Sequence, residues 1–222
     1  MPSERKLTRR RVTLVGISST AWEHPADRGA LTALRELRGF DEVVKTMSGL
    51  WNERAWRLQY LGAGIRCGNR QHPRVHRLLA EAAAALDVDE LPELYVMQSP
   101  LLQASCIGMA KPFIVVTSAA VATLDDDELR NLIGHELGHL RSGHGVYRTM
   151  MIILTNMSMT VAWLPVGSIA LRGIIAAMYE WWRKAELSAD RAGLLAGQDP
   201  SAALRVHMKL AGGGDLAEID TA

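Results

Sequence analysis

Cysteine is scarce in this sequence, with only Cys67 and Cys106 among 222 residues. The two lie far apart and form no Cys-x-x-Cys pair, so neither a disulfide framework nor a thiolate zinc site is expected, and a reducing compartment is allowed. An export signal is also missing, because the stretch after the N-terminal arginines, "VTLVGISSTAW", is shorter and more polar than the apolar part of a signal peptide. We therefore expect a cytoplasmic protein.

The chain also lacks an excess of charge of either sign. Lysine and arginine total 25, aspartate and glutamate total 24, and the formal net charge is +1. This balance gives no electrostatic reason to expect a nucleic acid partner. A hydrophobic content of 48% with 22% charged residues is ordinary for a folded globular protein, so disorder is not expected.

Helical periodicity dominates the first part of the chain. Apolar residues recur at helical spacing over residues 25–60, with a break near Gly39, which predicts two or three amphipathic helices. A further helix is predicted over residues 73–87, with a proline at its first position. We expect residues 1–90 to form an N-terminal helical segment packed on a core of residues 91–222, the two together making one compact unit.

Short apolar segments, partly β-branched, follow these helices and predict strands. The three segments are Leu94–Met97, Leu101–Ile107 and Phe113–Thr117. A turn-like "GMAKP" separates the second from the third. We expect a small antiparallel sheet. The fold class is therefore α+β and mainly helical.

A helix with an unusual composition is predicted next. Asp125 and Glu128 have the spacing of a capping box, which favours a helix over about residues 126–142. Gly134 and Gly138 lie one turn apart within it, although each glycine destabilises a helix by about 1 kcal/mol relative to alanine. Their repetition suggests that another part of the chain packs closely against the backbone there.

The same helix carries His135, Glu136 and His139 in the pattern His-Glu-x-x-His. Histidines four residues apart share a helix face and can direct their imidazole nitrogens at one ion. A glutamate beside that ion can take a proton from a water molecule that the ion acidifies, which is the arrangement of a zinc hydrolase. The motif alone is moderately specific, because five-residue patterns also occur by chance.

Two candidates remain open for the third metal ligand. His144 is near in sequence, but the long zincin pattern requires glycine at position 142 and histidine at 145, where this chain has Ser142 and Gly145. The glycines on either side of His144 predict the end of the helix and a surface or loop position for this histidine. Glu186 could instead complete a two-histidine, one-glutamate site, and Asp190 one turn later could accept the free ring N–H of a ligating histidine.

The chain thus carries two separated motifs, His135-Glu-Leu-Gly-His139 and Glu186-Leu-Ser-Ala-Asp190, and the segment "LDDDELRNLI" precedes the first. Together they resemble the HtpX and Ste24 type of zinc metallopeptidase, the M48 family of gluzincins. The resemblance covers about residues 90–210. It implies a zincin-like core in which one helix carries the His-Glu-x-x-His motif and a backing helix carries Glu-x-x-x-Asp. It also implies one zinc ion (Zn2+) per chain held by His135, His139 and Glu186, with Glu136 as the general base.

Members of that family commonly grip substrate backbone along an edge strand with an Asn-Ala-x-Ala segment. This chain has Gln103-Ala104-Ser105-Cys106 at the matching place. Addition of an extended peptide to a strand uses main-chain groups, so substrate binding by these four residues is expected to survive the change.

An uncharged stretch from Thr149 to Leu171 separates the two motifs. Because residues on both sides of it must meet at one metal ion, a single membrane crossing is excluded. A helical hairpin, buried or touching a membrane surface through residues 149–182, is favoured over two crossings, since Pro165 and Gly167 leave each half short.

The resulting expectation is a zinc-dependent metalloendopeptidase that acts on peptides or unfolded proteins. Two alternatives stay open: a latent zinc-binding module with a blocked cleft, and a membrane-associated quality-control protease. Since relatives continue further past the glutamate motif, and this sequence stops soon after "GGGDLAEIDTA", we also expect a C-terminal truncation.

Overall fold

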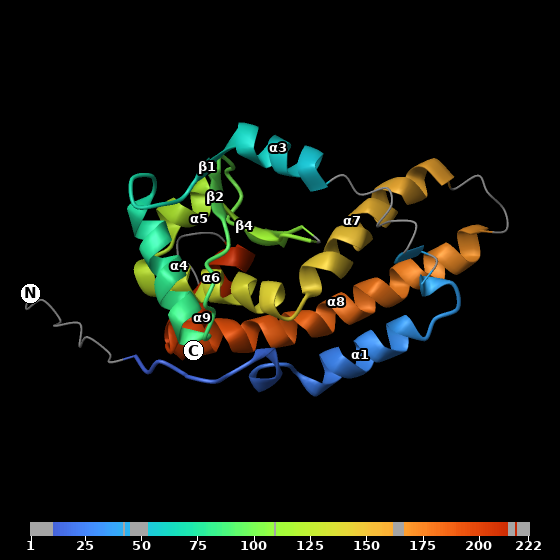
Figure 1. The fold of residues 1–222 in the computed structure, drawn as a ribbon, viewed down its shortest axis with the longest axis horizontal. Helices are drawn as coiled ribbons and strands as arrows, with labels where there is room; N and C mark the ends of the chain where they lie inside the picture. The colour runs from blue at the N-terminus through green and yellow to red at the C-terminus, as the bar shows by residue number, and fades with distance from the viewer. Residues whose placement is uncertain are drawn as a thin grey trace, which may run out of the picture.

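A computed structural model describes residues 11–41, 43–44, 53–108, 110–161, 167–212 and 216. Its helices are α1 (Pro25–Arg35), α3 (Glu53–Ala63), α4 (Pro73–Ala85), α5 (Ser118–Thr123), α6 (Asp126–Arg141), α7 (His144–Val161), α8 (Gly167–Gly197) and α9 (Pro200–Gly212). Its strands are β1 (Gly64–Arg66), β2 (Leu94–Met97), β3 (Ala104–Ile107) and β4 (Phe113–Thr117). The fold is thus mainly helical with one small sheet (Figure 1), which confirms the α+β, mainly helical class predicted from the sequence.

The sheet is mixed, so the prediction of an antiparallel sheet is wrong for one pair of strands. The strand order is β1-β2-β4-β3, and β2 runs parallel to β4 while the other two pairs are antiparallel. All five residues of β4 are buried, as expected for a continuous apolar strand with neighbours on both sides. Because β4 takes this inner position, β2 pairs with it and β3 is left at the edge of the sheet.

Helix α6 begins where the capping box predicts. The Asp125 side chain accepts hydrogen bonds from the backbone N–H groups of Asp127 and Glu128, and the Asp125 N–H donates to Glu128 Oε2 at 2.9 Å. The buried Glu128 carboxylate is also paired with Arg205 and Lys209 of α9. The cap therefore fixes both the start of α6 and the position of α9 beside it.

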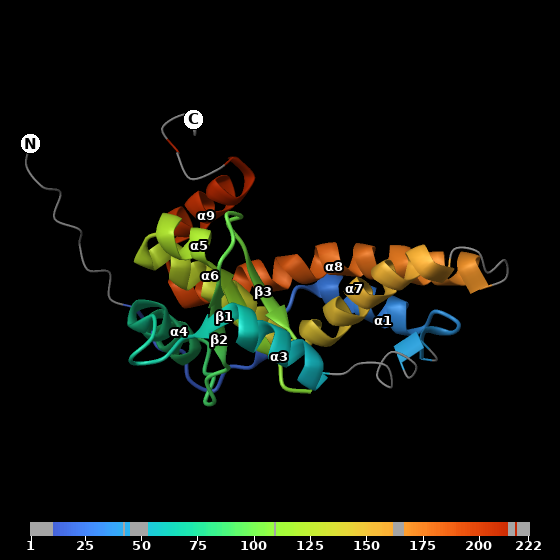
Figure 2. The same cartoon turned by 90° about the horizontal axis from the view of Figure 1, so that it is seen from above.

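Helices α6 and α8 approach each other at the two glycines, as the sequence predicts. A Cβ atom added at Gly134 would lie 2.3 Å from Ala196 Cβ, and one added at Gly138 would lie 2.5 Å from Ala192 Cβ. Figures 1 and 2 both show α6 lying along the C-terminal half of α8. This contact brings the two sequence motifs together.

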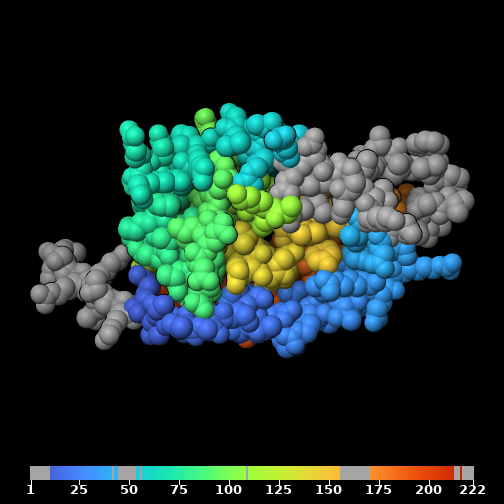
Figure 3. Space-filling view, viewed as in Figure 1, coloured from blue at the N-terminus to red at the C-terminus, as the bar shows by residue number. Residues whose placement is uncertain are grey.

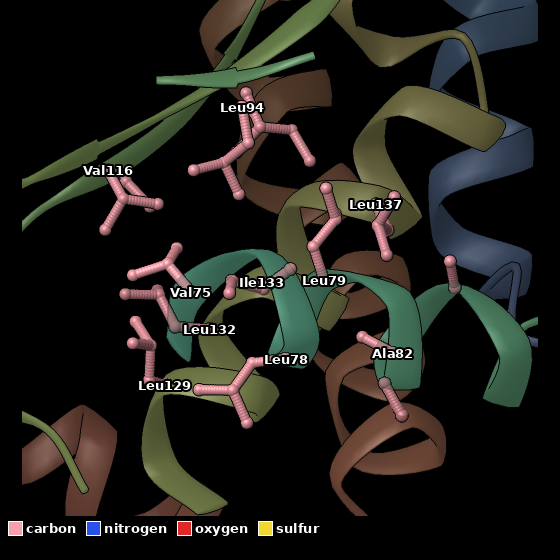
Figure 4. Close-up of a cluster of buried hydrophobic side chains, with 14 of the residues drawn as sticks. Val75, Leu78, Leu79, Ala82, Leu94, Val116, Leu129, Leu132, Ile133 and Leu137 are labelled. Carbon is pink, nitrogen blue, oxygen red and sulfur yellow. The ribbon is translucent and has the colours of Figure 1, made fainter. Parts of the chain in front are cut away.

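The other side of α6 packs into the main hydrophobic core (Figure 4). Its buried leucines and isoleucine face helix α4 and the sheet, and the labelled members of the cluster are Val75, Leu78, Leu79, Ala82, Leu94, Val116, Leu129, Leu132, Ile133 and Leu137. Full burial of each large side chain contributes about 1.5–3 kcal/mol. Helix α6 is therefore held between this core and α8.

Residues 11–35 run along one side of the molecule. Figure 3 shows them, in blue, along the lower edge from the first described residues to α1. Trp22 is completely buried and its indole N–H donates to Ser142 Oγ at 3.2 Å. Helix α1 then packs along α8. Part of the predicted helical range, residues 45–52, lies outside the described residues.

The described part of the uncharged stretch lies in α7 and at the start of α8, and these two helices pack against each other. Their inner face forms a second cluster with α1, made of Leu34, Phe40, Met150, Met151, Leu154, Ile174, Met178, Trp181 and Ala185. Residues 162–166, with Pro165, lie outside the described part of the chain. Among the helices that are described, none combines the length and the apolar character needed to span a bilayer.

Candidate metal centre

Three side chains from two helices converge on one point. His135 and His139 project from α6 and Glu186 from α8. The two Nε2 atoms are 3.1 Å apart, and the Glu186 carboxylate oxygens lie 3.4 Å from His135 Nε2 and 3.3 Å from His139 Nε2. Ligands about 2.0–2.2 Å from a tetrahedral zinc ion are separated by about 3.3–3.5 Å. The donor set and its spacing therefore fit zinc.

The charges around this point favour a cation. Asp190 Oδ1 lies 3.0 Å from His135 Nδ1. Because a carboxylate only accepts hydrogen bonds, His135 Nδ1 is the donor, and the other ring nitrogen, Nε2, points toward His139 and Glu186. Burial opposes the charged form of His135, but Asp190, Glu186 and the nearby Glu136 outweigh it and raise its pKa to about 10. Burial likewise opposes ionisation of Glu186, yet hydrogen bonds from the two histidines hold its pKa well below the usual value. The carboxylates of Asp190, Glu186 and Glu136 thus favour a positive charge at the point where the ligand atoms meet.

His139 behaves differently, because its ring is almost completely buried. Burial lowers its pKa, so this imidazole stays neutral. Its ring stacks on Trp182, with centroids 4.7 Å apart and planes 16° from parallel. A neutral, fixed imidazole is the form that ligates a metal ion.

Glu136 points into the same site without joining the ligand cluster. Its side chain is buried, and its Oε2 accepts no hydrogen bond from any described residue. The guanidinium of Arg148 lies nearby, with Nη1 3.8 Å from Oε2. A buried carboxylate oxygen without a donor is available to accept a proton from a bound molecule.

A cavity of about 320 Å³ opens onto these groups. Gln103 and Ala104, at the start of β3, form part of its wall, and Arg148 of α7 and His207 of α9 form other parts. The edge strand β3 therefore borders the three candidate ligand residues, which is the position that a substrate-binding strand needs.

The predicted substrate-binding residues do not all face the cavity. Gln103 and Ala104 do, whereas the Ser105 hydroxyl accepts a hydrogen bond from Arg148 Nη2 at 3.1 Å. The Cys106 side chain is buried and is not among the residues that line the cavity. Burial, with the nearby Glu136 carboxylate, raises the pKa of its thiol, so Cys106 is an unreactive packing residue.

Sequence reasoning missed Arg148, which is the charged residue closest to the site on α7. Its guanidinium lies over the Trp182 ring, 4.8 Å from the ring centroid, in addition to the contacts with Glu136 and Ser105. The available signal was a single arginine directly before a long uncharged stretch, a place where a charge needs a partner from elsewhere in the fold.

The predicted surface position of His144 is wrong, because this side chain is buried. A tight turn with Gly143 at a φ of +72° starts α7 directly after α6 and directs His144 inward. Its Nδ1 lies 3.0 Å from His139 Nδ1, and its Nε2 lies 3.1 Å from Asp27 Oδ2. His144 is thus on the far side of His139 from the ligand atoms. Within the part of the chain that the structure describes, the group that could hold a metal is His135, His139 and Glu186.

Comparison with known proteins gives an independent line of evidence. A family model described as "Peptidase family M48" matches residues 69–220. The chain is 39% identical over 194 residues to a plastoglobule-localized metallopeptidase 48 of the chloroplast from Arabidopsis thaliana, covering 86% of this chain and 56% of that protein. It is 36% identical over 92 residues to a protease HtpX homolog from Helicobacter pylori, covering 40% of this chain and 29% of that protein. The chain thus spans about half or less of the length of these relatives. No solved structure matches.

Proposed function

Because the chain belongs to peptidase family M48, we propose that it is a zinc-dependent metalloendopeptidase that hydrolyses peptide bonds of protein substrates. The observation that carries the proposal is the arrangement of four side chains. His135, His139 and Glu186 present donor atoms 3.1–3.4 Å apart, and Glu136 stands beside them with a carboxylate oxygen that accepts no hydrogen bond from the described residues. Three protein ligands leave a fourth position for water or substrate, which distinguishes a catalytic zinc site from a structural one.

One zinc ion per chain would be held by His135 Nε2, His139 Nε2 and the Glu186 carboxylate. When bound, it would supply a Lewis acid that polarises the substrate carbonyl and acidifies a water molecule. Asp190 keeps the proton of His135 on Nδ1 and so leaves Nε2 free to ligate.

Glu136 is the general base in this proposal. Its Oε2 would take a proton from the attacking water and later give it to the leaving amine. Burial limits the water around this carboxylate, and the Arg148 guanidinium keeps a positive charge close to it. The same positive charge at the cavity wall would favour the negative charge that develops on the substrate carbonyl oxygen.

The substrate would lie extended along the free edge of β3. Among the described strands this one pairs with β4 alone, so its outer main-chain groups can bind a peptide backbone. Gln103 and Ala104 would then contact the residues of the peptide next to the bond that is cleaved. In this proposal the segment 1–90 packs on the catalytic core 91–222 and completes it, and residues 149–182 form the part that would touch a membrane surface.

The variant Glu136→Gln tests the function. It should abolish hydrolysis of casein or of a quenched fluorescent peptide while keeping about one zinc per chain by elemental analysis. Glu180→Gln is a matched control, because Glu180 is an exposed glutamate of α8 that pairs with Arg183 and Lys184. Full activity of Glu136→Gln, or an inactive parent that contains zinc, would contradict the proposal; the second outcome would favour a latent zinc-binding module.

A further inference from the structure

A chain of buried polar groups leads away from the back of the metal centre. It runs from His139 to His144 and then to Asp27, with 3.0 Å between the two Nδ1 atoms and 3.1 Å between His144 Nε2 and Asp27 Oδ2. The side chains are 1%, 3% and 1% exposed, respectively. Neither His144 nor Asp27 has a part in the chemistry described above. Burying these polar and charged groups costs desolvation free energy, so a functional role would explain why the fold contains them.

Asp27 is built into the fold as an ionised carboxylate. Its Oδ1 accepts a hydrogen bond from the Trp181 indole N–H at 2.9 Å, and its Oδ2 accepts one from the Ser188 hydroxyl at 2.6 Å. It also lies in the first turn of α1, where the helix dipole stabilises a negative charge. Burial opposes ionisation, but the hydrogen bonds from His144, Ser188 and Trp181 outweigh it and lower the pKa of Asp27.

An ionised Asp27, together with a His144 ring that carries a single proton, sets the direction of the hydrogen bonds in this series. Because Asp27 can only accept, His144 must donate from Nε2. The Nδ1 atom of a neutral His144 ring is then an acceptor, so His139 must donate to it from its own Nδ1. His139 Nε2 is left without a proton, and this is the atom that faces His135 Nε2 and Glu186.

We propose that Asp27, acting through His144, is a positioning residue that fixes the tautomer and the ring orientation of His139 for metal binding. This inference rests on the proposed metal site and assigns a further pair of residues to it. Asp27 plays the part toward His139 that Asp190 plays toward His135, with one imidazole in between. Asp27 precedes the residues 69–220 that the family model matches, so the N-terminal segment completes a metal centre that lies within the matched region.

A purely structural role for Asp27 makes a different prediction. Through Trp181 and Ser188, which belong to α8, Asp27 also holds α1 against α8. Ser188→Ala weakens this attachment without touching His144, since the Ser188 hydroxyl contacts only Asp27 and the His24 N–H among the described groups. If docking of α1 were the only role, Ser188→Ala and Asp27→Asn would affect the metal site alike.

The test uses the full chain, stripped of metal, and measures the zinc dissociation constant by competition with a chromophoric chelator. Asp27→Asn keeps the side-chain size but offers the wrong mixture of donor and acceptor, and it should weaken zinc binding about 10- to 100-fold. His144→Phe keeps a ring beside Trp181 and should cause a similar loss. Ser188→Ala should lower the melting temperature and leave the dissociation constant as in the parent.

The double variant Asp27→Asn with His144→Phe separates the pathway from general damage. Because Asp27 acts through His144, adding Asp27→Asn to His144→Phe should leave zinc affinity unchanged, while it should raise the melting temperature by removing an unpaired buried charge. The visible absorption spectrum of the cobalt(II) form should change in each single variant and stay parental in Ser188→Ala, since it reports the ligand geometry.

Parental zinc affinity in Asp27→Asn, or an equal loss of affinity in Ser188→Ala, would overturn the inference. If Asp27→Asn does not fold, His144→Phe against the parent decides the question on the same criterion. Failure of the parent itself to bind zinc would instead refute the proposed function, so the two failures are distinguishable.

Discussion

Replacing Gly138 by alanine should disturb the metal site from a distance. The new Cβ atom would lie 2.5 Å from Ala192 Cβ and 3.3 Å from Ala189 Cα, both on α8. Carbon atoms that are not bonded approach to about 3.5–4.0 Å, so the two helices would have to separate by about 1 Å. A methyl group attached to a helix backbone cannot swing aside, and the strain is therefore carried by the helix positions.

The free energy of unfolding should fall despite a gain in helix propensity. Alanine is favoured over glycine by about 1 kcal/mol within a helix, whereas overpacking a core contact costs about 1–3 kcal/mol. Because the 2.5 Å approach puts the overpacking cost toward the upper part of that range, we expect a net loss of up to about 2 kcal/mol. Since His139 and Glu186 come from the two helices that separate, zinc affinity should also fall, by about 10-fold or more.

Denaturant unfolding and zinc competition measure the two effects, and two further variants control them. Gly173→Ala on α8 has no atom of the described residues within 4 Å of its new Cβ and should report the propensity gain alone. The swap of Gly138→Ala with Ala192→Gly moves the methyl group from one helix to the other and should restore both stability and zinc affinity. A Gly138→Ala protein that gains stability as Gly173→Ala does, with parental zinc affinity, would refute the reasoning.

Three other expectations follow from single contacts. Arg148→Met should lower kcat about 10-fold or more with parental zinc content, because it removes a cavity-lining charge 3.8 Å from Glu136; unchanged kcat would contradict this role. Glu81→Gln should cost about 1–2 kcal/mol at pH 7, since Glu81 pairs with the buried Arg130. Burial opposes ionisation of Glu81, but its arginine partners lower its pKa below 4.5, so its contribution is present above that pH and is lost as the pH falls through the folded pKa. Unfolding curves of parent and variant should therefore converge in acid, and a constant difference would count against the pairing. Burial raises the pKa of the Cys67 thiol to about 12, so iodoacetamide at pH 8 should label it only after unfolding, as mass spectrometry would detect.

Local features of this fold follow from the sequence. The capping box at Asp125 and Glu128 predicts the start of α6, and the repeated glycines at 134 and 138 predict the close approach of another element. Both are consequences of backbone geometry within one helix, where neighbouring residues suffice for the argument. The antiparallel prediction fails between β2 and β4 because strand order depends on which strand is buried on both sides, and this is decided by the packing of the whole sheet.

The residues of the candidate site likewise fall into those that the sequence predicts and those that it does not. The spacing of His135 and His139 on one helix predicts that they share a face, and resemblance to a family singles out Glu186 over His144 as their partner. Arg148, His144 and Asp27 could not be placed, because their positions depend on how α1 and α7 fold back onto α8. Nothing in the sequence near Asp27 indicates that its carboxylate faces a histidine beyond α6.

The central claim is that Glu186 shares one metal ion with two histidines of the earlier helix. Anomalous diffraction at the zinc absorption edge, from crystals of the full chain grown with zinc, tests it most directly. The account predicts a single strong peak about 2.0–2.2 Å from His135 Nε2, His139 Nε2 and a Glu186 oxygen. A zinc ion bound without Glu186, or no peak between α6 and α8 in a folded molecule, would contradict it.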